Sequence, residues 1–436
     1  MRPQLDTPKV RRAASGWRAA PCRLLFVAFL FAALPLTAAD LASAKLPPLP
    51  KHWPKRLQLG LTDGPGGAAA LKRSVPFGFR YQYLAGGVNT GQGWATWNTG
   101  GTFVDMYVSE SAKARVIPVF SYYMIRQSLP GSNDGNEPRA DLSNLRNKAT
   151  MRAWLKDVRL FMQRAGRFPK TPVVLQVEPD MWGYGEAAAK NDRAATVPAA
   201  VASSGADAGK GLPNDLTGVA RAAVRLRNRL APNVILAYHA SDWGTGVDFA
   251  ANDPSLNETG HLGDRAGRFY RSLGAGFDVT FTDWSDRDVG FKRAILGQGA
   301  DAWWDGADRE RAVRFIRAYS KRARQRVVVW QIPVGNTMMR AMNNTWGHYQ
   351  DNHVQWLLGT NGRKHLRALT GAGAIAFLFG GGADGTTCAC DGQHDGVTNP
   401  APIGGNTRLS YSADDDGGYL RHQARAFYRA GAPKLP

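Results

Sequence analysis

The chain has 436 residues, of which 44% are hydrophobic and three are cysteines, so it is long enough to bury a large core and has too few cysteines for a disulfide framework. Its 55 lysines and arginines exceed its 35 aspartates and glutamates, and the formal net charge of +20 favours anionic partners such as an acidic polysaccharide. The basic residues are spread along the chain, as in RLRNR at 225–229, without the blocks of a nucleic-acid-binding tail. We therefore expect no nucleic-acid partner.

Residues 1–44 differ from the rest of the chain. A basic stretch precedes the apolar run LLFVAFLFAALPLTA at 24–38, and the small residues Ala42-Ser43-Ala44 follow it. This order is typical of an export signal, and the apolar run is short for a membrane span. We expect cleavage after Ala44, which lowers the net charge to +16 and gives a secreted or periplasmic protein without stable membrane insertion. An uncleaved membrane anchor is the alternative.

From residue 56 onward, apolar β-type runs alternate with amphipathic helical runs. Eight strands are predicted, at 56–63, 77–87, 115–125, 171–180, 233–243, 277–286, 326–335 and 373–381. Helices are predicted at 150–166, 215–231 and 308–322, the last with Asp308 as its N-cap.

Alternation of apolar strands with helices indicates a parallel sheet that is covered on both faces. Eight such units predict a single (β/α)8 barrel over residues 45–436. An open doubly wound sheet is the alternative, but no Gly-x-Gly-x-x-Gly follows the first strand. Long connections follow the fourth and eighth strands, at 181–214 and 380–417, on the face of a barrel where sites are built.

Two carboxylates stand at the end of the fourth strand, in VVLQVEPD at 173–180. Side chains two apart in a strand share a face, so Gln176, Glu178 and Asp180 should point into the end of the barrel. Buried carboxylates are costly unless they are paired or used, and two neighbours repel, so that one of them holds a proton as a general acid must. Glu178 and Asp180 are therefore predicted to be catalytic. A helix cap or loop organiser is the alternative for each.

Other strand ends carry side chains of matching chemistry. Asp283 is predicted to be a further catalytic carboxylate, and the predicted substrate-binding residues besides Gln176 are Asp63, Tyr123, Trp182, His239, Asp242, Trp243, Trp284 and Gln331. Acids together with aromatic rings are typical of carbohydrate sites. The alternatives are loop caps for the acids and core packing for the tryptophans. No metal-ligand spacing and no phosphate-binding loop occur, so no metal or cofactor is predicted.

The run V-L-Q-V-E-P-D resembles the strand-end Glu-Pro-Asp signature of family-six cellulases, whose aspartate is the proton donor. The resemblance implies that Asp180 is the donor. It is confined to this run, and the likeness that we retain is the general one to secreted barrel glycoside hydrolases. Retaining enzymes commonly carry a second glutamate on the seventh strand, where this chain has Gln331. An inverting or substrate-assisted reaction, with the second carboxylate from Asp283, Asp242 or Asp63, fits the sequence better.

The sequence thus predicts an exported glycoside hydrolase that cleaves a polysaccharide or oligosaccharide by carboxylate acid/base catalysis. One alternative is a non-catalytic barrel that binds carbohydrate or serves envelope assembly. The other is a polysaccharide lyase, which would use a lysine, tyrosine or histidine base against an acidic sugar.

Overall fold

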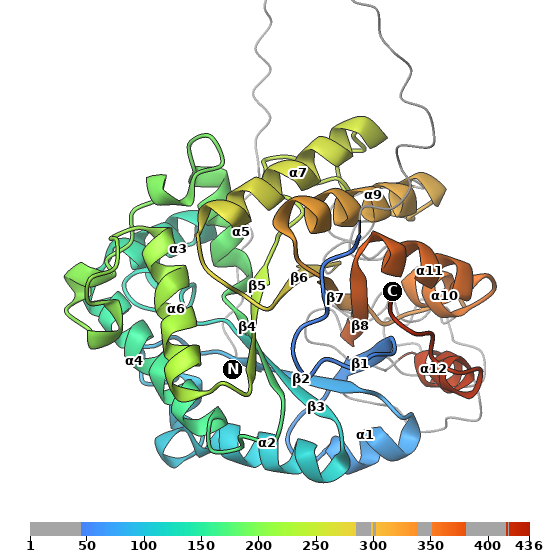
Figure 1. Ribbon diagram of the computed structural model, residues 1–436, viewed down its shortest axis with the longest axis horizontal. Coiled ribbons are helices and arrows are strands. Elements are labelled where there is room, and N and C mark those ends of the chain that lie inside the picture. The colour runs from blue at the N-terminus through green and yellow to red at the C-terminus, as the bar shows by residue number, and fades with distance from the viewer. Residues whose placement is uncertain (1–44, 285–297, 300–301, 339–350, 381–415, 417) are drawn as a thin grey trace, which may run out of the picture. The chain divides into compact units, whose positions relative to one another are not determined.

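The computed structural model describes residues 45–284, 298–299, 302–338, 351–380, 416 and 418–436. Eight parallel strands form a closed barrel in chain order, with the last strand paired to the first (Figure 1). The strands are β1 (Gln58–Thr62), β2 (Phe79–Leu84), β3 (Ile117–Tyr122), β4 (Val173–Val177), β5 (Val234–His239), β6 (Val279–Asp283), β7 (Val327–Pro333) and β8 (Ala374–Gly380). The predicted (β/α)8 barrel is confirmed, with each strand inside its predicted range. The predicted export signal and most of 380–417 lie outside the described residues.

Helices surround the barrel. They are α1 (Ala68–Ser74), α2 (Thr102–Ala114), α3 (Glu137–Arg146), α4 (Lys148–Ala165), α5 (Pro179–Ala188), α6 (Leu216–Leu230), α7 (Leu256–Ser272), α9 (Gly306–Ala323), α10 (His353–Leu358), α11 (Gly362–Ala372) and α12 (Tyr419–Arg429). None of the helices within the described residues is long and apolar enough to cross a bilayer.

The helix termini follow from local side-chain chemistry. Asn147 begins α4 by accepting a hydrogen bond from the Thr150 N–H. α9 begins earlier than predicted because Asp305 is its N-cap, and Asp308 lies at the third helical position, where its side chain bonds back to the Asp305 N–H. The two form a capping box. The prediction of Asp308 as the N-cap is wrong, because Asp305 is the N-cap and Asp308 is its partner in the box.

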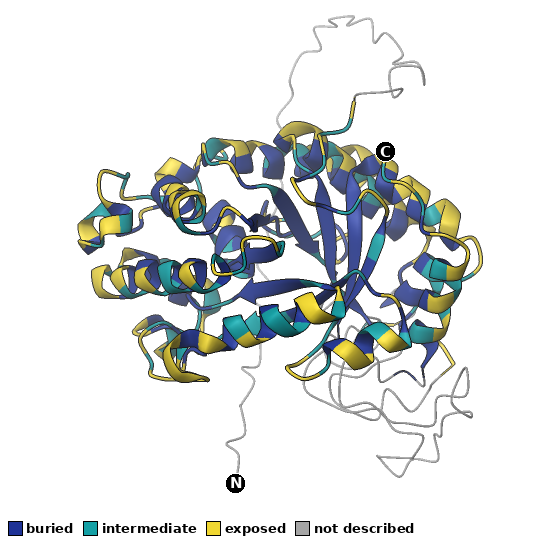
Figure 2. Ribbon diagram, turned by 60° about the horizontal axis from the view of Figure 1, so that its bottom comes forward, coloured by how far each residue is buried: buried dark blue, intermediate teal, exposed yellow. Residues whose placement is uncertain are grey.

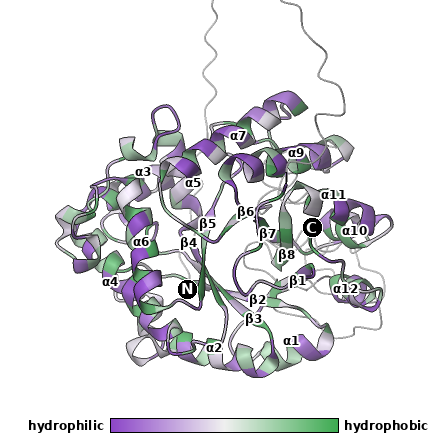
Figure 3. Ribbon diagram, viewed as in Figure 1, coloured by the Kyte–Doolittle hydropathy of each residue, from purple (hydrophilic) through white to green (hydrophobic). Residues whose placement is uncertain are grey.

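The core has two layers. One fills the barrel with inward side chains such as Val119, Val174 and Phe281, and the other lies between the strands and the helices. Figure 2 shows the strands buried inside a ring of helices whose outer faces are exposed, and Figure 3 shows the same helices hydrophilic on their outer faces. Apolar side chains therefore occupy both faces of each strand, as expected for a parallel barrel.

The fourth strand ends three residues before the predicted end. β4 stops at Val177, Glu178 adopts a left-handed conformation with φ of 45°, and Pro179 opens α5. A proline fits the first turn of a helix because that position has no N–H partner to lose. The expectation that Gln176, Glu178 and Asp180 share one strand face is therefore wrong. Only Gln176 lies in the strand, while Glu178 caps α5 and Asp180 lies in its first turn.

The two ends of the described barrel chain meet at its base, before the first residues of the strands. The Arg326 side chain donates hydrogen bonds to the carbonyl oxygens of Pro47 and Pro436. The Leu435 N–H donates to the Lys55 carbonyl oxygen at 3.0 Å. Residues 47–55 and 435–436 therefore lie beside the amino-terminal end of β7, opposite the barrel end that carries Asp283.

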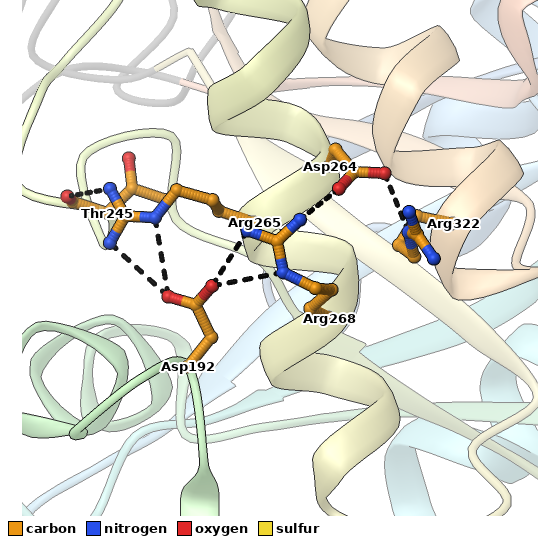
Figure 4. A network of polar contacts seen from close by, with 6 residues as sticks. All are labelled: Asp192, Thr245, Asp264, Arg265, Arg268 and Arg322. Atoms are coloured by element: carbon orange, nitrogen blue, oxygen red, sulfur yellow. Dashed lines mark hydrogen bonds and ion pairs between the residues drawn. The ribbon is translucent and has the colours of Figure 1, made fainter.

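An ion-pair network on the outside of the barrel joins the segment after α5 to α7 and α9 (Figure 4). Asp192 accepts hydrogen bonds from Arg265 and Arg268, and Asp264 pairs with Arg268 and Arg322. Arg265 also donates to the Thr245 carbonyl oxygen at 3.2 Å. The loop after β5 is thereby tied to α7 from the outside.

Candidate active site

We call the end of the barrel formed by the carboxyl-terminal ends of the strands the mouth. Polar side chains from β2 to β7 gather there, in a group of acids after β3 and β4 and a histidine–aspartate pair at β5 and β6. Sites of (β/α)8 barrels lie on this face because the loops that follow the strands converge on it.

The acid group begins with α3, which follows β3 and was missed from the sequence. Its first residue, Glu137, accepts a hydrogen bond of 2.6 Å from the Tyr123 hydroxyl, and Arg126 lies 3.9 Å away from its carboxylate. The signal in the sequence is the run N-E-P at 136–138, in which Asn136 caps the helix through the Arg139 N–H. Tyr123, a predicted substrate-binding residue, is thus bonded to an acid that the prediction did not include.

Asp141 is the second acid on α3 that the prediction missed. Its side chain is buried, and among the described residues its Oδ1 atom has no hydrogen-bond partner. Burial, and then the negative charges of Glu178, Glu137 and Asp180, raise its pKa to about 9. Asp141 is therefore protonated near neutral pH.

Glu178 is directed away from the mouth. Its carboxylate accepts hydrogen bonds from the Met124 and Ile125 N–H groups at 3.0–3.1 Å and from Trp154 Nε1 at 2.7 Å. Burial raises its pKa to about 8, against the opposing effect of these donors. Because the side chain is 1% exposed and both oxygens are engaged, it joins the start of the β3–α3 loop to α4 and offers no surface to a substrate.

Asp180 lies in the first turn of α5 and is partly exposed. Burial is the largest cause of the raised pKa of Tyr123, and the negative charge of Asp180 is the next largest. The charge of Asp180 also raises the pKa of Tyr184, after burial and the charge of Glu137. These effects place its carboxylate near both rings and near Asp141. A carboxylate at a helix N-terminus is favoured by the helix dipole.

The second group runs across the inside of the barrel. Gln176 bonds to Ser121 on one side and to His239 on the other, at 2.7 and 2.8 Å. The His239 Nε2 atom lies 3.2 Å from the Asp283 carboxylate, which is 14% exposed. The structure therefore brings together three of the predicted residues, Gln176, His239 and Asp283.

Aromatic rings from β2 and β7 line the mouth beside these groups. Trp330 packs against Tyr83 and His239 with ring centroids 5.7 and 5.8 Å apart. Gln331, at a register shift between β7 and β8, has φ of 48° and donates a hydrogen bond to the Tyr83 hydroxyl. Gln331 thus reaches the mouth through a β-bulge, a common device for re-aiming a side chain.

Trp243 packs on Tyr184 of α5, with ring centroids 4.7 Å apart, and both residues are partly exposed. This approach needs a glycine, because a Cβ on Gly183 would lie 2.6 Å from both the Ser241 hydroxyl and the Trp243 ring. The pair forms an aromatic surface about one turn along α5 from Asp180.

Four predicted residues have other surroundings. Asp63 pairs with the buried Arg80 at 2.9 Å, and Asp242 is fully buried. Trp182 donates to the Val177 carbonyl oxygen and packs on Tyr238 in the core. Trp284 is buried against Trp304, with ring centroids 5.3 Å apart. Trp182 and Trp284 are 0% and 1% exposed and lie in the core, and their contact with substrate stays a prediction.

Within the described residues, no cluster of three or more histidine, cysteine or acidic side chains could hold a metal ion. Asp384, Asp391 and Asp395, which cluster with glycines in the connection at 380–417, lie outside the described residues.

The sequence matches no known protein family and no curated protein. Among solved structures, the chain is similar to a glycoside hydrolase-like protein at 10% identity and a TM-score of 0.40, covering 89% of this chain and 98% of that one. It is also similar to a GH6 enzyme of Orpinomyces sp. Y102 (13% identity, TM-score 0.33, 63% and 69% covered) and to a putative lyase/mutase from Burkholderia cenocepacia J2315 (13% identity, TM-score 0.33, 75% and 77% covered). These similarities carry no conclusion about the reaction, and the barrel fold rests on the strand pairing described above.

Proposed function

We propose that the chain is an exported glycoside hydrolase that cleaves a polysaccharide or oligosaccharide. The observation that carries the proposal is the presence of two accessible carboxylates, Asp180 and Asp283, on different elements of one barrel mouth and in different surroundings. Glycosidic bond hydrolysis needs two carboxyl groups whose environments differ, one to give a proton and one to receive it.

In the proposed reaction, Asp180 donates its proton to the leaving-group oxygen as the glycosidic bond breaks. Asp283 accepts a proton from the water that attacks the sugar carbon from the opposite side, which inverts its configuration. A substrate-assisted route would instead retain the configuration, because a group of the sugar attacks first. The anomeric configuration of the first product, followed by NMR, separates the two routes.

The other mouth residues support this assignment. Glu178 holds the turn from which Asp180 projects, which makes it a positioning residue in place of the predicted acid. The exposed pair of Trp243 and Tyr184 offers a stacking surface for a sugar ring.

The proposal is tested by product release from envelope and plant polysaccharides, acidic ones included. The control is an Asp180→Asn, Asp283→Asn double variant, which keeps the size of both side chains. New reducing ends with the unmodified chain, and none with the control, would support hydrolysis. Binding without products would indicate a non-catalytic barrel, and unsaturated products would indicate a lyase.

Export is proposed from the sequence of residues 1–44. Recovery of the protein outside the cytoplasm, with Lys45 as its first residue, would support it. Recovery in the membrane fraction with residues 24–38 attached would show an anchored enzyme.

A further inference from the structure

A continuous chain of polar contacts crosses the barrel interior from β3 to β6. Ser121, Gln176, His239 and Asp283 come from four consecutive strands and bond one to the next at 2.7, 2.8 and 3.2 Å. The first three are 0–1% exposed, while Asp283 is the member that reaches the mouth. The interior layer below them is apolar, with Val119, Val174 and others.

The groups at the two ends of this series of contacts decide which atom donates and which accepts in each hydrogen bond. The Ser121 hydroxyl donates to Gln176 Oε1, which leaves Gln176 Nε2 facing His239 Nδ1. An amide nitrogen only donates, so Nδ1 must be the acceptor and the ring proton lies on Nε2, which donates to the Asp283 carboxylate.

If the Gln176 amide were turned the other way and the ring were neutral, the contact between His239 and Asp283 would be unfavourable. That orientation would require a proton on Nδ1, and a neutral ring would then present the Nε2 lone pair to the carboxylate of Asp283. Two acceptors would face each other at 3.2 Å. With a neutral ring and an ionised Asp283, only one orientation satisfies every member.

We propose that Gln176 and His239 are positioning residues that orient the Asp283 carboxylate as the base of the reaction proposed above, on which this inference rests. Burying an amide and an imidazole in a barrel interior is costly unless each is hydrogen-bonded, and apolar side chains would fill the space at lower cost. The Trp330 ring stands at 81° to the His239 ring, 5.8 Å from it, and limits its rotation. Neither Gln176 nor His239 is exposed, so both act through Asp283 and not on the substrate.

The decisive variant is Gln176→Glu, which keeps the shape and removes the amide donor. His239 can then bond to residue 176 only through a proton on Nδ1, as the other tautomer or as the imidazolium ion. We expect the ¹⁵N signals of His239 to move from the pattern of an Nε2–H ring to one with a protonated Nδ1. The eight histidines are distinguished by ¹⁵N labelling, and the signal that is lost in His239→Gln belongs to His239.

The kinetic expectation is a fall in kcat of about tenfold to a hundredfold with little change in KM, the usual effect of losing a group that orients a catalytic one. Two control variants bracket it. Ser121→Ala leaves the amide pointing at His239, so it should leave the His239 signals unchanged and cost less activity. His239→Gln, whose amide can still donate toward Asp283, should keep more activity than His239→Leu. Thermal unfolding of each variant shows that it is folded.

Three results would overturn the inference. Unchanged His239 signals in Gln176→Glu would show that the chain of contacts does not exist. A changed tautomer with unchanged kcat would show that it exists without positioning the base. A rise in KM at constant kcat would show that Gln176 contacts the substrate. If the unmodified protein hydrolyses no glycan, the proposed function itself is wrong. The assay of the unmodified protein shows this before any variant is made.

Discussion

The two acid regions of the mouth handle negative charge in opposite ways. After β3 and β4, four carboxyl groups lie close together, and burial with the negative charges of its neighbours raises the pKa of Asp141 to about 9. At β5 and β6, the Asp283 carboxylate lies 3.2 Å from a histidine nitrogen that can donate to it. Crowding keeps protons in the first region, and a donor supports the ionised form in the second. The roles proposed above, proton donation by Asp180 and proton acceptance by Asp283, draw on this contrast.

The largest expected effect separates these two roles. Asp180→Asn and Asp283→Asn should each reduce turnover of the natural glycan at least about a hundredfold, the usual contribution of a general acid or base. With a dinitrophenyl glycoside, whose leaving group needs no proton, Asp180→Asn should recover activity and Asp283→Asn should not. Initial rates on both substrates measure this. Recovery by Asp283→Asn instead would reverse the assignment.

Next in size is the pH dependence of stability. Between the ordinary aspartate pKa near 4 and the raised pKa of about 9, folded Asp141 keeps a proton that the unfolded chain has lost. The free energy of unfolding therefore falls as pH rises through this window, by up to about 1.4 kcal/mol per pH unit from this group. Asp141→Asn should flatten the fall between about pH 5 and pH 8 in urea unfolding.

Asp134 provides the matched control for this measurement. It lies in the segment just before α3, and hydrogen bonds from Arg139 hold its pKa at about 2. Its contribution is present above the ordinary pKa and is lost only as pH falls toward 2, so Asp134→Asn should leave the slope above pH 5 unchanged. Equal slopes for the unmodified protein and Asp141→Asn would show that Asp141 is ionised in the folded state.

The buried anchor of the first region is tested by Glu178→Gln. The amide that replaces one carboxylate oxygen cannot accept, so it sets a donor against the Trp154 or backbone N–H groups. We expect a loss of about 1–3 kcal/mol in the free energy of unfolding. Glu137→Gln, at a partly exposed acid that accepts from Tyr123, should lose less. Equal losses in urea unfolding would contradict the anchoring role.

The smallest expected effect concerns the stacking surface beside both regions. Trp243→Ala should weaken glycan binding by about 1 kcal/mol, roughly fivefold, with kcat nearly unchanged. Trp356→Ala is the control, since this ring stacks on His365 between α10 and α11. Calorimetric titration of the Asp180→Asn protein with and without each change measures binding alone. Equal binding by all three proteins would remove Trp243 from the site.

The sequence predicted the barrel well because apolar runs and amphipathic periods are local signals, as at 171–177 and 150–165. It failed at Glu178, where a single left-handed residue turned the side chain out of the barrel. Asp141 was missed because its burial and its charged neighbours arise only when α3 packs against α4 and α5. The burial of Trp182 was not predicted for a related reason, since an aromatic residue after a strand has the same sequence pattern whether it lines a mouth or fills a core.

The contacts at the base of the barrel have a consequence for engineering. Because Arg326 holds the carbonyl oxygens of both Pro47 and Pro436, a short linker could join the two ends of residues 45–436 without moving a strand. New termini could then open at Gly211, an exposed glycine with φ of 72° in the connection between α5 and α6. Such a circular permutant would keep every strand pairing of the barrel while letting a fused binding module be attached at the side of the molecule.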